Sequence, residues 1–410
     1  MADRAESIVP STAFGVYVHF PFCRQRCSYC DFAIAVRPQI PHQEYLSALR
    51  HELAAKVSLF PERRAVSVYF GGGTPSLWEP ACLATALQDI QATFPAPLGI
   101  PMEVTLECDP GGVSLDQLLA WRAAGVTRLS IGAQSFSHHH LTALRRQHQP
   151  EQIMELVDRA CQTGFDRISL DLLIGMTGQT EEELAEDLRQ LLVLSPEHVS
   201  LYQLTVEPHT LLSVHIRRGQ TQAPSPDQQA DAFQTVRHTL QAHGYRHYEI
   251  SNFARARPDD PDYRAVHNRL YWTHGEYLGL GVSAHSFRRL SEGGGERFAN
   301  HRGPSAYLRT WGRAADRRPF VPSATEPSLS LYEQRAPESL WREALWLALR
   351  ELDGVRWSQF VALHHVDPRQ ACAAILARLT ERGLVISSPD SLRLSDQGVL
   401  FADDVGAAFL

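Results

Sequence analysis

The first half of the chain alternates short apolar runs with longer helix-like segments, and this alternation restricts the possible folds more than any other feature. The runs that we predict to be strands cover residues 14–20, 67–70, 102–107, 128–132, 167–175 and 198–204. The segments between them, 42–58, 80–92, 114–124, 150–163 and 181–194, have helical periodicity. Strands and helices that alternate at this spacing predict parallel βα units. Six such units could form a doubly wound sheet or a partial barrel.

Each predicted strand ends in polar or glycine residues, and this distribution favours the barrel. The ends are the cysteine-bearing loop 23–30, the run Gly71 to Thr74, Glu107, Gln134, Asp171 and Gln203. Ligands of parallel α/β folds bind at the carboxyl ends of the strands. Six strand ends around one mouth suit a barrel better than a single crevice, so we predict an α/β fold with a partial (β/α)6 TIM-like barrel.

The pattern changes after residue 205. Residues 225–243 look helical, 247–253 look like one more strand, and 254–312 are rich in loop-forming residues. A Pro- and Ser-bearing stretch precedes a strong helix at 338–352, and the last residues read as helix, turn and hairpin. We therefore predict a tail over 1–13, the barrel over 14–205, an α+β extension over 206–316, a linker over 317–335 and a small winged-helix-like module over 336–410.

Composition and charge argue against several classes of protein. The formal net charge of the 410 residues is −7, so we expect no basic field that would attract nucleic acid or anionic lipid. No run of about 18 apolar residues predicts a membrane-spanning helix, and the start of the chain lacks the pattern of a secretory signal. We expect a cytoplasmic protein. In that compartment the scattered cysteines Cys82, Cys108, Cys161 and Cys372 are expected to be buried thiols.

Three further cysteines, Cys23, Cys27 and Cys30, lie together in a C-x3-C-x2-C pattern directly after the first predicted strand. A structural zinc site normally needs four ligands, and only His19, on the strand itself, is nearby. Thiolates also hold iron–sulfur clusters, and three thiolates on one loop can bind three irons of a four-iron cube. The fourth iron is then open to a small molecule. The spacing favours the cluster and leaves zinc as an alternative.

This pattern, with the aromatic Tyr29 before the last cysteine, resembles the signature of radical S-adenosylmethionine (SAM) proteins. The resemblance implies a partial (β/α)6 barrel, a [4Fe-4S] cluster on the loop after the first strand, and SAM bound through its amino and carboxylate groups to the fourth iron. In that family a glycine run like 70–76 binds the amino group of SAM. Physically, such a run brings the backbone close to a ligand and aims N–H groups at it. Alone, it also fits a tight βα turn.

Several strand-end residues are ambiguous alone but together resemble one group of radical SAM proteins. Glu107 and Asp171 could bind hydroxyl or ammonium groups, and Arg146 suits a carboxylate. In this order they resemble the family that contains oxygen-independent coproporphyrinogen III dehydrogenase and the heme chaperone HemW. The resemblance implies a SAM pocket formed by Tyr17, Tyr29, Gly72, Gly73, Thr74, Glu107, Gln134, Arg146 and Asp171.

Two features separate the branches of this family. The dehydrogenase has a fourth cysteine where this chain has Phe32, and it carries a longer N-terminal segment. The heme chaperone branch carries H-N-x-x-Y-W, and residues 267–272 read HNRLYW. The resemblance implies heme contact by His267, Asn268, Tyr271 and Trp272, and it makes 206–316 a HemN-type extension. Imidazole and aromatic rings suit heme, although a hydrogen-bonded core histidine explains the same residues.

Two other histidine features are weaker. His285, in GVSAHSF, is a second candidate heme neighbour. The run SHHH at 137–140 is expected to be a solvated loop rather than a metal site.

The resemblance implies a heme chaperone of porphyrin metabolism with three cofactors: a [4Fe-4S] cluster, SAM and heme. Its partner would be a heme-accepting protein, such as a membrane respiratory haemoprotein, and a homodimer is left open. Two alternatives also stay open. One is an oxygen-independent coproporphyrinogen III dehydrogenase, which is a true enzyme. The other is a scaffold that bears the cluster without catalysis.

Overall fold

The structure is a computed structural model that describes residues 13–312 and 320–410. The predicted tail 1–13 lies outside the described residues except for Ala13, the first residue of β1.

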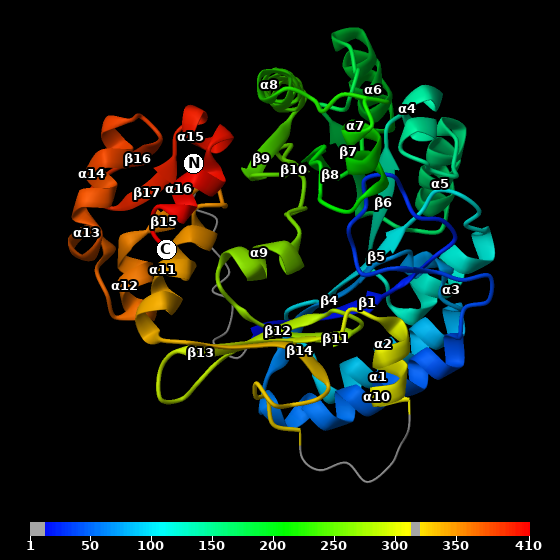
Figure 1. The fold of residues 1–410 in the computed structure, drawn as a ribbon, viewed down its shortest axis with the longest axis horizontal. Coiled ribbons are helices and arrows are strands. Elements are labelled where there is room, and N and C mark those ends of the chain that lie inside the picture. Colours follow the sequence, from blue (N-terminus) through cyan, green and yellow to red (C-terminus); the bar gives the residue numbers. More distant parts are fainter. Residues whose placement is uncertain (1–12, 313–319) are drawn as a thin grey trace.

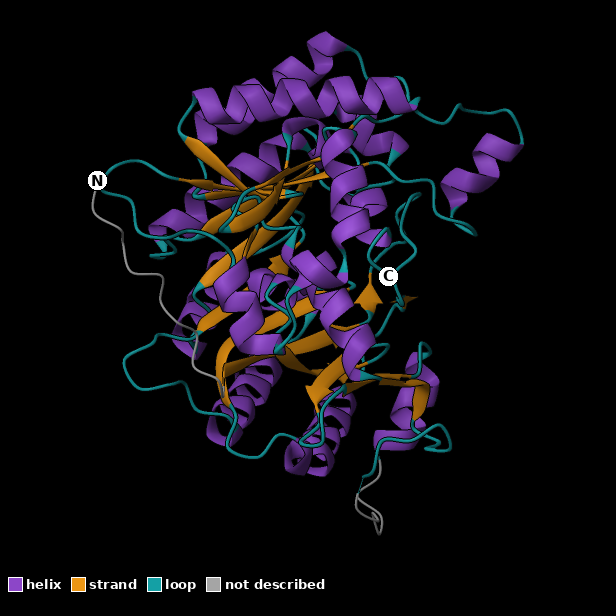
Figure 2. Ribbon diagram, turned by 90° about the vertical axis from the view of Figure 1, so that its left-hand side faces the viewer, coloured by secondary structure: helices purple, strands orange, loops and turns teal. Residues whose placement is uncertain are grey.

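All six predicted strands of the first half form, and they lie side by side in parallel. They are β1 (Ala13–Phe20), β4 (Arg64–Gly72), β5 (Glu103–Cys108), β6 (Arg128–Gln134), β7 (Ile168–Ile174) and β8 (His198–Gln203). The helices between them are α1 (His42–Lys56), α2 (Pro80–Thr93), α3 (Leu115–Ala124), α5 (Pro150–Gln162) and α6 (Glu181–Leu194). Figure 2 shows the strands as a curved layer with helices packed along its outside. The predicted partial barrel is confirmed.

Local sequence explains these elements. In β1, Phe14, Val16 and Val18 are fully buried at alternate positions, while Tyr17 and His19 face the other side of the strand. Helices α3 and α6 begin with capping boxes at Ser114 and Thr180, and these side chains satisfy N–H groups of the first turn.

Short elements fill the connections of the barrel. They are β2 (Phe22–Cys23), β3 (Ala35–Val36), α4 (His138–Ala143), α7 (Leu211–Arg217) and the 3-10 turns Val57–Leu59 and Pro75–Leu77. Helix α8 (Pro226–Ala242) matches the helix predicted at 225–243.

The α+β character predicted for the extension is confirmed, but the individual elements predicted within residues 247–312 are largely wrong. The single strand expected at 247–253 is a hairpin of β9 (Tyr245–Glu249) and β10 (Asn252–Arg255). The segment expected to be loop-rich contains α9 (Val266–Trp272), β11 (Glu276–Gly281), β12 (His285–Arg289), β13 (Gly295–Asn300) and α10 (Pro304–Trp311). A further strand, β14 (Leu329–Arg335), lies within the range predicted as a linker.

These added strands extend both edges of the barrel sheet. The order of its strands in the described residues is β14-β13-β12-β11-β1-β4-β5-β6-β7-β8-β10-β9. Strand β11 pairs in parallel with β1, whereas β12, β13 and β14 follow as antiparallel neighbours. Gly279 and Gly281 of β11 are needed because a Cβ at either position would collide with backbone atoms of residues 285 or 19.

The last residues form the predicted winged-helix-like module. Its elements are α11 (Pro337–Ala348), β15 (Val355–Arg356), α12 (Trp357–His364), α13 (Pro368–Ala371), α14 (Ala373–Glu381), β16 (Val385–Ser387), β17 (Ser391–Leu394), α15 (Asp396–Leu400) and α16 (Ala402–Ala407). Strands β15, β17 and β16 form a small antiparallel sheet. In Figure 1 this module, orange to red, lies beside α9.

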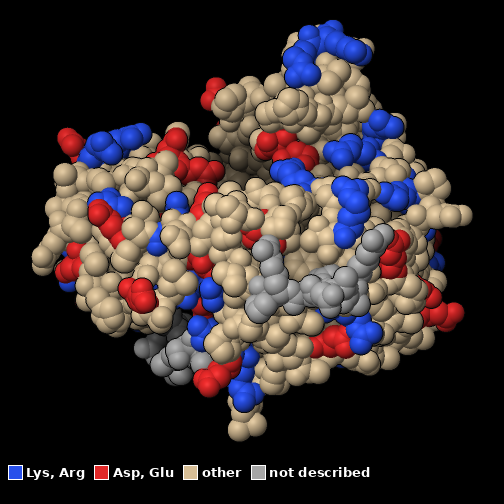
Figure 3. Space-filling view, turned by 60° about the horizontal axis from the view of Figure 1, so that its bottom comes forward, with Lys and Arg blue, Asp and Glu red and all other residues tan. Residues whose placement is uncertain are grey.

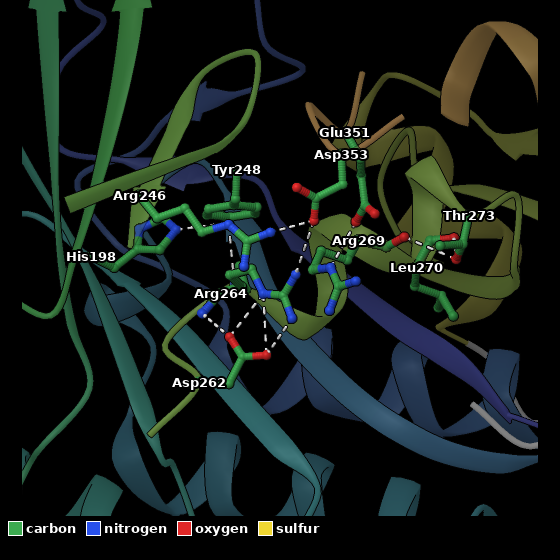
Figure 4. A network of polar contacts seen from close by, with 11 residues as sticks. His198, Arg246, Tyr248, Asp262, Arg264, Arg269, Leu270, Thr273, Glu351 and Asp353 are labelled. Carbon is green, nitrogen blue, oxygen red and sulfur yellow. Dashed lines mark hydrogen bonds and ion pairs between the residues drawn. The ribbon is translucent and has the colours of Figure 1, made fainter. Parts of the chain in front are cut away.

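Polar contacts join the module to the barrel through α9. Figure 4 shows Arg246, Arg264 and Arg269 pointing toward the carboxylates of Glu351 and Asp353. The Nε atom of Arg269, a residue of α9, donates to Glu351 at 2.7 Å. Helix α9 is therefore held between the barrel and the C-terminal module.

The sequence contains 39 Lys and Arg residues and 46 Asp and Glu residues. On the face that Figure 3 shows, basic and acidic side chains are interspersed. None of the helices in residues 13–312 and 320–410 has the length and apolarity that crossing a membrane requires.

Candidate functional site

The three clustered cysteines lie on the loop that follows β1. Cys23 is buried in β2, and Cys27 and Cys30 are half-buried on the turn beyond it. The Thr74 hydroxyl lies 3.4 Å from Cys23 Sγ, and Arg146 Nη1 lies 3.7 Å from Cys27 Sγ. Both donors belong to other strand–helix connections, so the loop is anchored to the barrel mouth.

Burial affects the protonation of two of these thiols. Burial raises the pKa of Cys23 to about 11 and also raises the pKa of Cys30. Within the described part of the chain, no three Cys, His, Asp or Glu side chains converge on a single metal ion. A cubane cluster requires a different arrangement, because each thiolate binds its own iron. The three-thiol donor set fits such a cluster.

The glycine run that follows β4 is tightly enclosed. Gly72 has a φ of +110°, and a Cβ there would lie 2.7 Å from the ring of His19. Backbone N–H groups of the run all donate within the protein: Gly72 to Glu107 Oε2 (3.0 Å), Gly73 to the carbonyl of Phe20 (2.7 Å) and Thr74 to the carbonyl of Phe22 (3.0 Å). The expectation that these N–H groups face a ligand is wrong. Carbonyl oxygens are the acceptors that an ammonium group needs.

Two carboxylates predicted at strand ends face the inside of the barrel. Glu107 also accepts a hydrogen bond from the Tyr69 hydroxyl at 2.9 Å, and burial raises its pKa to about 7. Asp171 accepts from the hydroxyls of Ser130 (3.0 Å) and Ser169 (3.2 Å), and burial raises its pKa as well. Glu107 and Asp171 are both half-buried, and the charge of Asp171 also acts to raise the pKa of Glu107, so the structure brings the two carboxylates near each other.

Arg146 is already bound within the protein. Its Nη2 atom donates to Asp109 Oδ2 and to the carbonyl of Gly132, both at 2.8 Å. Burial acts to raise the pKa of Asp109, but its contacts with His148 and Arg146 lower it to about 2. The sequence prediction missed Asp109 and His148, although Asp109 lies two residues beyond Glu107. Gln134 ends β6 with a φ of +65°, where the register with β7 shifts.

Tyr17 and His19 form a hydrogen-bonded pair on the inner side of β1. The Tyr17 hydroxyl lies 3.1 Å from His19 Nδ1, and His19 Nε2 lies 3.0 Å from the carbonyl of Ala33. Burial lowers the pKa of His19 to about 4, so its ring is neutral near pH 7. Both ring nitrogens are engaged, and the fourth metal ligand considered for a zinc site is therefore not free. Tyr29 packs against a small apolar cluster that includes Leu144 and Leu173.

The HNRLYW motif forms helix α9, and its histidine lies in the core. His267 Nδ1 is 2.9 Å from the Ser67 hydroxyl, and its Nε2 is 2.8 Å from the Tyr271 hydroxyl. Burial lowers the pKa of His267 to about 3. Iron ligation by His267 would require breaking one of these two bonds. Asn268 and Trp272 are half-buried.

A cavity of about 570 Å³ lies between α9 and residues 31–33, which directly follow the cysteine loop. Its lining residues are Tyr17, His19, Asp31, Phe32, Ala33, Tyr271, Trp272, His274, Gly275, Tyr277, Ser283, His285, Phe287, Arg297, Arg302, Glu343 and Leu347. The lining is rich in aromatic rings and lies within the usual size range of ligand pockets, roughly 300–1,000 Å³. Of the lining residues in β11 to β13, only His285 was predicted as a candidate, because the strands themselves were not predicted.

Two minor predictions are corrected. Ser137 caps α4, and His140 is buried and lies 3.1 Å from Glu183, so the SHHH run is not a solvated loop throughout. Among the scattered cysteines, Cys82, Cys108 and Cys372 are buried as expected, but Cys161 is exposed.

The barrel and its cysteine loop define a radical SAM protein. A model of the Radical SAM superfamily matches residues 17–191, and a model of the HemN C-terminal domain matches residues 336–401. The coproporphyrinogen III oxidase HemN of Escherichia coli, a radical SAM enzyme, shares the fold with a TM-score of 0.79 at 24% identity, over 98% of this chain and 90% of that chain.

Curated relatives identify the family more closely. The heme chaperone HemW of Escherichia coli (strain K12) is 36% identical over 315 residues, which cover 76% of this chain and 79% of the relative. The heme chaperone HemW of Bacillus subtilis (strain 168) is 31% identical over 96% of this chain and 98% of the relative. The chain belongs to the HemW family.

Proposed function

We propose that this protein is a heme chaperone that holds a [4Fe-4S] cluster, binds SAM and transfers heme to an acceptor haemoprotein. The observation that carries the proposal is the aromatic cavity between the cysteine loop and α9. A porphyrin is a flat apolar ligand, and such a cavity offers it aromatic faces beside the cluster loop. The names of the HemW relatives support the same function.

In this proposal Cys23, Cys27 and Cys30 hold the cluster. When bound, such a cluster supplies an electron for SAM chemistry. Arg146 Nη1, at 3.7 Å from Cys27 Sγ, would balance the negative charge of that thiolate. Thr74 would donate its hydroxyl hydrogen to the Cys23 thiolate from 3.4 Å.

SAM would bind at the mouth of the barrel. The carbonyl groups of the glycine run would accept hydrogen bonds from its ammonium group, because the N–H groups of the run are used internally. The proposed SAM residues are Tyr17, Tyr29, Gly72, Gly73, Thr74, Glu107, Gln134, Arg146 and Asp171. Among them, Arg146 would act mainly by positioning the cysteine loop, since its guanidinium is already bound to Asp109.

The test combines heme binding with a check for enzymatic turnover. Anaerobically reconstituted protein is titrated with heme and followed by its Soret absorption, and the heme-loaded protein is then mixed with an apo-haemoprotein. We expect saturable heme binding followed by transfer. In parallel, the protein is incubated with SAM, a reductant and coproporphyrinogen III.

Two results would contradict the proposal. Absence of a Soret band, together with no formation of protoporphyrinogen IX, would leave only a cluster-bearing scaffold. Formation of protoporphyrinogen IX would assign the chain to the dehydrogenase branch instead. We also propose a cytoplasmic location, while a membrane respiratory acceptor and a homodimer stay predictions.

A further inference from the structure

The two candidate heme histidines differ in whether their ring nitrogens are free. His267 is 1% exposed, and both of its nitrogens lie within hydrogen-bond distance of hydroxyl groups. His285, the first residue of β12, is exposed and lines the cavity. Its imidazole makes no hydrogen bond with any other residue in the described ranges 13–312 and 320–410. His285 therefore offers a nitrogen lone pair to the cavity without the loss of an existing contact.

Aromatic rings around His285 provide surfaces for a flat ligand. Tyr271 and Tyr277 pack edge to face with ring centroids 4.7 Å apart, and Phe287 lies on the same strand as His285. Trp272 follows Tyr271 at the end of α9, and its indole Nε1 is buried without a partner among the described atoms. Ring faces of this kind pack favourably against a porphyrin macrocycle.

The two arginines of the cavity differ in the same way as the two histidines. Arg297 pairs with Glu343 and lies 3.8 Å from Glu333, so carboxylates already compensate its charge. Arg302 is exposed, and its one hydrogen bond in the described residues goes to the carbonyl of Asp31 at 3.2 Å. No carboxylate pairs with Arg302 in that part of the chain. A guanidinium in this state can bind a carboxylate of a ligand through two parallel hydrogen bonds.

We propose that His285 supplies an axial ligand to the heme iron and that Arg302 binds a heme propionate in this cavity. This inference rests on the heme-chaperone function proposed above. It assigns to His267 of the HNRLYW motif a different role, because that residue joins α9 to β4 through Ser67 and positions Tyr271 at the cavity wall. Imidazole is a common axial ligand of heme iron.

The test compares heme binding by anaerobically reconstituted wild-type protein with that of His285→Ala, Arg302→Gln and the control His139→Ala. His139 is exposed on α4 and does not line the cavity. We expect His285→Ala to bind heme at least tenfold more weakly and to lose the optical and electron-paramagnetic signature of imidazole ligation. Added imidazole should restore that signature. Arg302→Gln should weaken binding about threefold to tenfold with the ligation signature unchanged, and His139→Ala should behave as wild type.

The outcomes separate this inference from the proposed function. If the wild-type protein binds heme and His285→Ala keeps the wild-type affinity and signature, the ligand assignment is wrong while the chaperone function stands. If the wild-type protein binds no heme, both fail. The variant His267→Gln provides the converse measurement: when folded, it should retain the ligation signature, and loss of that signature only in His267→Gln would overturn the assignment to His285. Iron and sulfide content, measured for every variant, confirms that the proteins compared are folded and loaded alike.

Discussion

Two regions of the molecule use their polar side chains differently. One is the set of strand ends at the mouth of the parallel barrel, and the other is the cavity wall formed by β11 to β13. At the barrel mouth, Glu107, Asp171 and Arg146 are all engaged with neighbouring protein groups. In the cavity wall, His285 lacks a hydrogen bond and Arg302 lacks an acidic partner among the described residues. The comparison distinguishes a preorganised part, where we propose that the cluster and SAM bind, from an open part, where we propose that heme binds.

The largest expected effect concerns the cysteine loop. We expect Cys27→Ala to lose most of the bound iron and sulfide after anaerobic reconstitution, because one of three thiolate ligands is removed. Cys161→Ala is the matched control, since Cys161 is exposed and lies on α5, away from the loop. Chemical iron and sulfide analysis measures the effect. A Cys27→Ala protein with the full wild-type content would refute the cluster assignment.

The next effect tests whether the two regions form one unit. Glu52 of α1 is fully buried and accepts hydrogen bonds from Lys56 Nζ, Asn300 Nδ2 and Tyr307 Oη, each at 2.6 Å, and from Gly281 N at 2.8 Å. Removing one partner of a buried ion pair destabilises a protein by about 3–5 kcal/mol. We expect Glu52→Ala to lower the free energy of unfolding by that amount.

Glu155→Ala is the control for this prediction, because Glu155 forms an exposed ion pair with Arg159 on α5. Exposed pairs contribute about 0.2–1 kcal/mol. Denaturant unfolding followed by circular dichroism measures both variants. Equal effects of the two substitutions would show that Glu52 does not join the regions.

A smaller effect is expected at the glycine run. Gly72→Ala places a Cβ 2.7 Å from the His19 ring at a φ of +110°, so strain and overpacking should lower stability by about 3 kcal/mol. Gly178 also has a positive φ, +73°, but a Cβ there meets no atom within 4 Å. Gly178→Ala should therefore have an effect of only about 1–2 kcal/mol. Thermal unfolding distinguishes them, and equal losses would contradict close packing at Gly72.

Much of the parallel region could be predicted from sequence, and most of the added strands could not. Alternating burial in strands such as β1 and capping residues such as Ser114 are local features, and local periodicity reports them. Glu52, by contrast, looks like a surface residue of a helix when only its sequence neighbours are considered. Its partners Gly281, Asn300 and Tyr307 lie 229 to 255 residues away, so local periodicity does not report them.

The candidate site also has a part that the sequence predicts and a part that it does not. The spacing of Cys23, Cys27 and Cys30 predicts their common loop. That spacing contains no information about the hydrogen bonds of His267 or about the cavity wall near His285. Gly281 lies inside β11 because the backbone of His19 approaches it closely, and the local sequence does not report that approach.

The smallest effect concerns pH. Burial lowers the pKa of His267 to about 3, whereas an unfolded chain has a histidine pKa near 6.5. Below about pH 6.5 the unfolded state binds a proton at this histidine that the folded state does not bind. The free energy of unfolding therefore falls as the pH falls below 6.5, and His267 has no such effect above pH 6.5. We expect His267→Gln to show a shallower loss of stability between pH 6.5 and 5 than wild type. Parallel pH profiles of the two proteins would contradict the buried, neutral state of His267.

The central claim is that heme occupies the cavity between the cysteine loop and α9, and filling that cavity tests it most directly. Leu347 of α11 lines the cavity, whereas Val193 on α6 is 69% exposed and does not line it. Heme titration of reconstituted Leu347→Trp should show at least a tenfold loss of affinity with unchanged iron and sulfide content, while Val193→Trp binds as wild type. Wild-type heme affinity in a folded Leu347→Trp protein would contradict the claim.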